Sequence, residues 1–155
     1  MLIKGKDVAE FRKTGTCGCV SKRFPLKTEN DLKDWMVIKR SLDAEEKWSM
    51  QMHSHPDFEE YWFVIEGEGQ FIVGDKIYDV EVGDLVITPP GVPHKAIGDV
   101  VFVCTMAKHN SNGKTIGSKQ AYVAHDTPYR DDPEELPKVG ERVEFDATEE
   151  LGGAS

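Results

Sequence analysis

The feature that most constrains the fold is a series of short β-forming runs between residues 60 and 106, separated by glycine-containing turns. The runs are rich in β-branched and aromatic residues, and they are too short for typical globular helices. The strands expected are Trp35–Ile38, Ser49–His55, Glu60–Ile65, Gln70–Val73, Lys76–Val80, Asp84–Thr88, Asp99–Met106, Ala121–Ala124 and Arg142–Phe145. Turns are expected at 67–69, 74–75, 83–84 and 89–93. This density of strands and turns predicts an all-β barrel or sandwich.

The N-terminal 27 residues show no regular pattern of this kind. Asp7–Lys13 is predicted to form one short helical turn, and Thr28–Leu32 a turn or a brief capped helix. Cys17 and Cys19 resemble half of a zinc ligand set, but no second half with suitable spacing follows. A structural or incidental role is therefore favoured for this cysteine pair.

The length of 155 residues predicts a single domain, and a hydrophobic content of 39% with 30% charged residues is ordinary for a soluble protein. No apolar run is long enough to span a bilayer, and the N-terminus has no apolar core of a signal peptide. Three cysteines give an odd count with no disulfide framework. A cytoplasmic location is therefore expected, with no membrane partner.

The net charge of −9 argues against a nucleic-acid partner. Residues 126–155 hold ten acidic and three basic residues, net −7, so most of the charge is assigned to an acidic C-terminal tail.

The candidate chemistry begins with a pair of histidines two residues apart, His53 and His55. Side chains two positions apart on a strand point to the same face, so both imidazoles can be directed at one metal ion. A carboxylate follows, either Glu59 or Glu60. Alternation places Glu60, but not Glu59, on the face of Trp62.

The spacing of these residues and of a second group resembles the two motifs of the cupin superfamily. The two patterns are His53-x-His55-x4-Glu60-x6-Gly67 and Gly83-x5-Pro89-x-Gly91-x2-His94. Two departures are Lys47, where a glycine often opens the first motif, and Gly98, where an asparagine often closes the second. Both lie outside the family's ligand positions.

The resemblance implies a double-stranded β-helix, the cupin or jelly-roll barrel, over residues 35–125. Residues 1–34 are then an N-terminal extension packing on the barrel, and residues 126–155 an acidic C-terminal extension. The metal ligands carried over are His53, His55, Glu60 and His94. His109 and His125 lie outside both motifs and are expected to be surface residues.

Three imidazoles and one carboxylate suit Fe, Mn, Ni, Co, Cu or Zn as a divalent ion, and the ligand types do not choose among them. Strand alternation adds Gln51, Trp62 and Val64 as candidate walls of a substrate pocket. No catalytic side chain is identified, since no serine or cysteine nucleophile with a partnered base is visible.

The functional hypothesis is a metal-dependent enzyme, of dioxygenase (oxidoreductase), isomerase or lyase type, acting on a small oxygenated molecule. The alternative is a non-catalytic cupin that binds or senses a small molecule with its metal. The resemblance also implies a homodimer. The expected outer apolar surface comprises Met50, Met52, Tyr61, Phe63 and Ile65. Either a second chain or this chain's own N-terminal segment or acidic tail could cover it.

Overall fold

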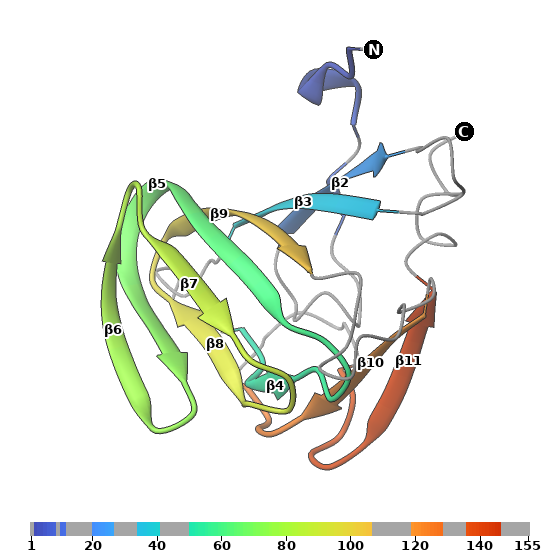
Figure 1. The fold of residues 1–155 in the computed structure, drawn as a ribbon, viewed down its shortest axis with the longest axis vertical. Coiled ribbons are helices and arrows are strands. Elements are labelled where there is room, and N and C mark those ends of the chain that lie inside the picture. Colours follow the sequence, from blue (N-terminus) through green and yellow to red (C-terminus); the bar gives the residue numbers. More distant parts are fainter. Residues whose placement is uncertain are drawn as a thin grey trace.

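The computed structural model describes residues 2–8, 10–11, 20–26, 34–40, 50–106, 119–128 and 136–146. Apart from one 3₁₀ turn, the regular elements of this part are all strands, as predicted (Figure 1). They are η1 (Gly5–Asp7), β1 (Glu10–Phe11), β2 (Val20–Leu26), β3 (Asp34–Arg40), β4 (His53–Ser54), β5 (Glu60–Val73), β6 (Lys76–Glu81), β7 (Leu85–Thr88), β8 (His94–Ile97), β9 (Val100–Met106), β10 (Lys119–Ala124) and β11 (Arg142–Asp146).

The strands form two antiparallel sheets that share β5. The first sheet has the order β1-β2-β3-β9-β5-β7, and it uses the N-terminal half of β5. The second has the order β6-β5-β8-β4-β10-β11, and it uses the C-terminal half. Figure 1 shows β5 running the length of the barrel wall, with β6 and β7 beside it in turn.

The predicted turn at 67–69 is wrong, because these residues lie inside β5, a continuous strand of 14 residues. The pairing with β9 shifts register between Val64 and Glu66, and Gly67 has a φ of +80°. A Cβ at Gly67 would lie 2.1 Å from the Asp99 carbonyl oxygen, and one at Gly69 would lie 2.3 Å from the Ile97 carbonyl oxygen. The glycines therefore let the β8–β9 turn lie directly against the strand.

The core is a cluster of aromatic and aliphatic side chains between the two sheets. Its largest members are Trp62, Phe71 and Phe102, whose ring centroids lie 5.2–5.6 Å apart, and Cys104 is buried with them. Met50 is also in this cluster, fully buried. Its predicted place on the outer surface is wrong because residues 50–52 precede β4 and are not strand, so the alternation does not extend to them.

The structure differs from the sequence prediction at several other elements. Glu10–Phe11 forms a strand within the segment predicted as a helical turn, and β2 and β8 were not predicted. The predictions for Cys17, Cys19, Thr28–Leu32 and His109 lie outside the described residues. The division at 34 and 125 stays a prediction, although β2 and β11 each pair with a barrel strand.

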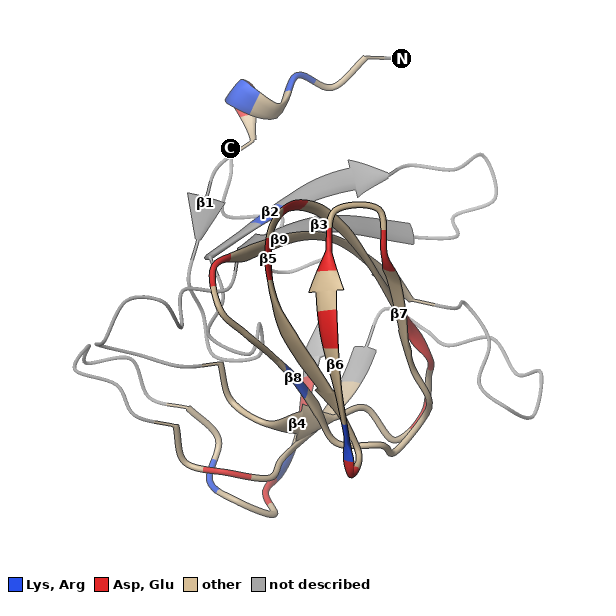
Figure 2. Cartoon of the chain, turned by 90° about the vertical axis from the view of Figure 1, so that its left-hand side faces the viewer, with Lys and Arg blue, Asp and Glu red and all other residues tan. Residues whose placement is uncertain are grey.

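The charge of the molecule is not confined to the C-terminal tail. Residues 50–106 contain ten acidic and two basic residues, net −8. Figure 2 shows acidic positions along β6, where Asp79 and Glu81 are exposed. Among the described residues, no helix is long and apolar enough to cross a membrane.

A test of the glycine contact replaces Gly69 with alanine. The new methyl group would meet the Ile97 carbonyl and the Val100 side chain, at 2.3 and 2.7 Å. We expect urea denaturation to show a loss of about 3 kcal/mol, the upper range for overpacking. Gly91→Ala is the matched control, because nothing lies within 4 Å of its Cβ and only its φ of +74° is strained. That strain costs about 1 kcal/mol, and equal losses in the two variants would contradict the steric argument.

Candidate metal centre

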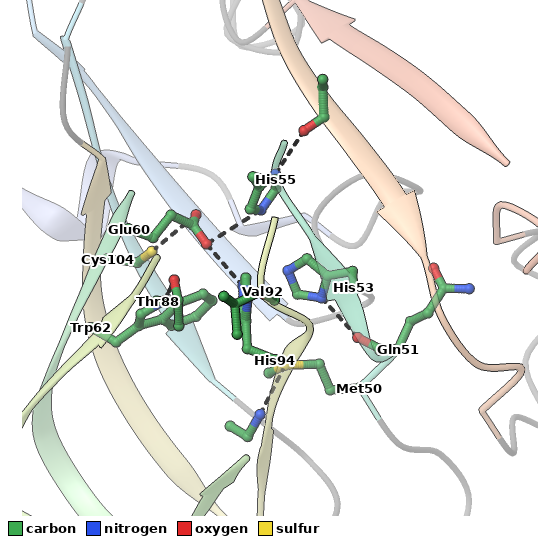
Figure 3. Close-up of polar contacts among 12 residues, drawn as sticks. Met50, Gln51, His53, His55, Glu60, Trp62, Thr88, Val92, His94 and Cys104 are labelled. Atoms are coloured by element: carbon green, nitrogen blue, oxygen red, sulfur yellow. Dashed lines mark hydrogen bonds and ion pairs between the residues drawn. The ribbon is translucent and has the colours of Figure 1, made fainter. Parts of the chain in front are cut away.

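The four residues of the predicted ligand set meet inside the barrel. His53 lies in β4, His55 just after it, and Glu60 and His94 begin β5 and β8. One candidate ligand atom from each residue lies within 4.8 Å of all the others, and each residue is at most 5% exposed. Two ligands on opposite sides of a transition-metal ion lie about 4.2 Å apart. Figure 3 shows the four side chains converging from the β4 segment, β5 and β8.

Each histidine is held by a hydrogen bond from its Nδ1 to a main-chain carbonyl. His53 donates to Gln51 O at 2.8 Å, His55 to Ala121 O at 2.9 Å, and His94 to Val92 O at 2.9 Å. Because a carbonyl can only accept, each Nδ1 carries a proton, and the neutral form of each ring has its lone pair at Nε2. This is the orientation in which histidine binds a metal through Nε2.

The Nε2 atoms face a carboxylate. Glu60 Oε2 lies 3.2 Å from His94 Nε2 and 3.3 Å from His55 Nε2. His55 Nε2 is a buried atom with no hydrogen-bond partner among the described residues. Lone pairs of neutral nitrogens beside a carboxylate oxygen repel, unless a cation lies between them. The donor set therefore fits a divalent metal ion.

The pKa values argue against a proton as that cation. Burial lowers the pKa of His53 well below its ordinary value of 6.5, and the neighbouring His94 and His55 lower it further. Burial also lowers the pKa of His94, and the opposing effect of the neighbouring Glu60 carboxylate does not reverse this. Both rings are therefore neutral at neutral pH.

The second oxygen of Glu60 is also bonded. Cys104 Sγ lies 3.6 Å from Glu60 Oε1 and donates to it (Figure 3). Glu60 is buried on the same face as Trp62, as the alternation predicted. Glu59 accepts a hydrogen bond from the Tyr61 hydroxyl on the other face.

The predicted pocket residues are all buried, and two of them have hydrogen-bond partners in the protein. The Gln51 amide donates to Asp126 O and Pro137 O, so its polar group is used within the fold. Trp62 donates from Nε1 to Thr88 Oγ1 at 3.3 Å, and its ring lies 5.7 Å from that of His94. Val64 belongs to the core cluster. Their role as pocket walls stays a prediction.

Sequence reasoning missed the ring contacts of the centre. Tyr122 stacks on His53, with centroids 4.8 Å apart and an interplanar angle of 10°. Phe58 stacks on His55, with centroids 4.5 Å apart. Phe58 lies in the first motif and could have been suspected, whereas nothing in the sequence relates residue 122 to residue 53.

The histidine pKa values predict how the stability of the metal-free protein depends on pH. Below about pH 6.5 His53 and His94 are protonated in the unfolded chain but remain neutral in the folded protein, so the free energy of unfolding falls as the pH falls. Between about pH 6.5 and 5.5 the loss should approach about 1 kcal/mol for His53, whose pKa lies well below 6.5, and His94 should add to it in the same direction. Urea denaturation of chelator-treated protein measures it. His53→Asn should show a shallower decline, and an unchanged decline would contradict the assignment.

Comparison with protein families identifies the central part of the chain. Residues 42–107 match a family model described as a cupin domain. An uncharacterized protein of Sinorhizobium fredii is 48% identical over 42 residues, which are 27% of this chain and 19% of that protein. An uncharacterized protein of Methanocaldococcus jannaschii is 35% identical over 51 residues, which are 32% of this chain and 41% of that protein. The chain therefore matches less than half the length of these relatives.

Solved structures show the same fold. Pac13 of Streptomyces, described as a nucleoside dehydratase, has a TM-score of 0.55 at 16% identity, over 75% of this chain and 90% of that one. A predicted oxalate decarboxylase of Thermotoga maritima has 0.52 at 18%, over 68% and 97%. A double-stranded β-helix protein of Klebsiella pneumoniae has 0.51 at 17%, over 81% and 97%. The predicted double-stranded β-helix is confirmed.

Proposed function

Because residues 42–107 of this chain are a cupin domain, we propose that the protein is a metal-dependent enzyme acting on a small oxygenated molecule. The proposed ligands of the metal are His53, His55, Glu60 and His94. The reaction would be of dioxygenase, isomerase or lyase type, in which a bound divalent metal supplies Lewis-acid or redox chemistry.

The observation that carries the proposal is the approach of His55 Nε2 and His94 Nε2 to the buried Glu60 Oε2, at 3.3 and 3.2 Å, with His53 beside them. The main-chain carbonyls of Gln51, Ala121 and Val92 fix the rings without titratable partners. The protein thus holds the ring orientations before any metal arrives, which lowers the entropy lost on binding. Four protein ligands on a six-coordinate ion leave two positions for substrate or water.

The first test replaces Glu60 with glutamine and measures metal content and affinity. Loss of the charged ligand should weaken binding of Co(II) or Zn(II) by more than about 100-fold, beyond what loss of an outer partner costs. Glu59→Gln is the matched control, because the neighbouring carboxylate is on the other face and bonds Tyr61. Affinities that fall equally in both variants, or in neither, would contradict the ligand assignment.

The second test concerns turnover. Protein purified without an affinity tag is analysed for metal, and then assayed for dioxygen uptake on diketones, catechols and thiols. Keto-sugars, nucleosides and oxalate extend the panel to isomerase and lyase chemistry, the last two because the structural relatives include a nucleoside dehydratase and a predicted oxalate decarboxylase. Full metal occupancy without turnover on any of these would favour the alternative, a small-molecule-binding cupin.

We also propose that the protein forms a homodimer through the outer face of β5 and β7. Phe63, Ile65, Leu85 and Ile87 are 45%, 38%, 54% and 47% exposed there, and Phe63 pairs directly with Leu85. Of the five residues in the sequence prediction, this surface contains Phe63 and Ile65, whereas Met50 is buried and Met52 and Tyr61 are partly buried. With the β7 residues it is apolar enough to favour association.

A charge on this face should separate the dimer. Leu85→Glu with Ile87→Glu is expected to shift the mass measured by light scattering from two chains to one, since burying two carboxylates is unfavourable. Ile77→Glu is the control, because Ile77 is 62% exposed on β6, which pairs with the other half of β5. A dimer that survives the double change would place the interface elsewhere.

A further inference from the structure

A chain of polar contacts connects the segment just before β4 to β10 and to the segment after β10. Gln51 is 1% exposed, and its Nε2 donates to Asp126 O at 3.1 Å and to Pro137 O at 2.8 Å. Its Oε1 accepts a hydrogen bond from the Tyr122 hydroxyl. Both amide protons and the amide oxygen are thus paired within the fold, and Tyr122 is completely buried.

The same two residues contact His53 in two independent ways. The main-chain carbonyl of Gln51 accepts the Nδ1–H of His53 at 2.8 Å. The Tyr122 ring lies flat on the His53 ring, with an interplanar angle of 10°. One contact fixes the tautomer of His53 and the other fixes the plane of its ring. Tyr122 also meets His55 edge-on, with centroids 5.8 Å apart.

The carboxylate of Asp126 holds the residue after Gln51 in place and also contacts β8. Its Oδ1 accepts the main-chain N–H of Met52 at 2.7 Å, and its Oδ2 lies 3.4 Å from Lys95 Nζ on β8. The main-chain N–H of His125 donates to Met52 O at 2.8 Å. The backbone before β4 has little strand pairing of its own, and these contacts hold it in place.

We propose that Tyr122 and Gln51 are positioning residues of the metal centre. The Tyr122 hydroxyl fixes the Gln51 side chain through its hydrogen bond. The fixed side chain keeps the main chain of Gln51 in place, and the Gln51 carbonyl then orients the His53 ring so that Nε2 points at the other ligands. This inference rests on the proposed metal-binding function. It extends the site to Tyr122, which lies beyond the cupin match at residues 42–107.

A role in filling space alone would not need this chemistry. A phenylalanine and a leucine could occupy the same volume, and a buried amide is unfavourable unless all its partners are present. Removing one partner leaves a buried acceptor unpaired, and the segment must rearrange to satisfy it. Since this segment includes the Gln51 carbonyl that accepts the hydrogen bond of His53, its rearrangement should lower the metal affinity.

The test compares two variants that each lose one tyrosine hydroxyl bonded to a side-chain oxygen. Tyr122→Phe keeps the ring on His53 but removes the bond to Gln51. Tyr61→Phe removes the bond to Glu59 on the outer face of β5 and is the matched control. Co(II) affinity is measured by competition with a chelator, the visible absorption spectrum reports coordination geometry, and thermal unfolding of metal-free protein reports folding.

We expect Tyr122→Phe to weaken Co(II) binding by about 10-fold or more and to shift the visible bands. Tyr61→Phe should leave both unchanged. Gln51→Met, which keeps the main-chain carbonyl but loses the amide, should act in the same direction and provides a second reading if Tyr122→Phe does not fold.

The outcomes separate the two proposals. If wild-type protein binds one Co(II), and Tyr122→Phe and Gln51→Met both match its affinity and spectrum, the positioning role is wrong and the metal site stands. This holds even if the unfolding temperatures of the two variants fall. If wild-type protein binds no Co(II), the proposed function fails and this inference falls with it.

Discussion

The centre of this protein depends on the hydrogen bonds from three histidine Nδ1 atoms to main-chain carbonyls. A carbonyl cannot donate, so each ring is committed to one tautomer by the backbone itself. The unprotonated nitrogens at the other side of the rings then point at a buried carboxylate, an arrangement that is favourable only around a cation. The chemistry of the site is thus set by backbone placement, and the strands that supply those carbonyls are as much part of it as the ligands.

The placement of those strands follows from β5. Its first half pairs with β7 and β9, and its second half with β6 and β8, so one strand belongs to both sheets. The change of sheet occurs where the register shifts near Gly67, and the glycines there let the β8–β9 turn approach closely. Glu60 and His94 face each other because β5 and the loop before β8 are held in these positions.

The convergence of His53, His55, Glu60 and His94 was anticipated because the motif spacing of the family resemblance and the alternation of side chains along a strand both point to these residues. Parity separated Glu60 from Glu59 correctly, since that part of β5 is regular strand. The same alternation gave the wrong face for Met50, because the chain is not strand there. The glycines at 67–69 wrongly predicted a turn, because it is close packing against the β8–β9 turn that requires them. Tyr122 could not be predicted at all, because its contact with His53 depends on the pairing of β10 with β4.

The four proposed ligands come from both sheets, and this bears on how the barrel holds together. Glu60 lies in the half of β5 that pairs within the first sheet, whereas His53 and His94 pair with each other in the second. An ion bound by all of them is a cross-link between the sheets that forms only in the folded chain. The folding equilibrium is then linked to the concentration of free metal, and each tenfold increase above the dissociation constant adds about 1.4 kcal/mol. A barrel built in this way would take part of its resistance to unfolding from the metal supply around it.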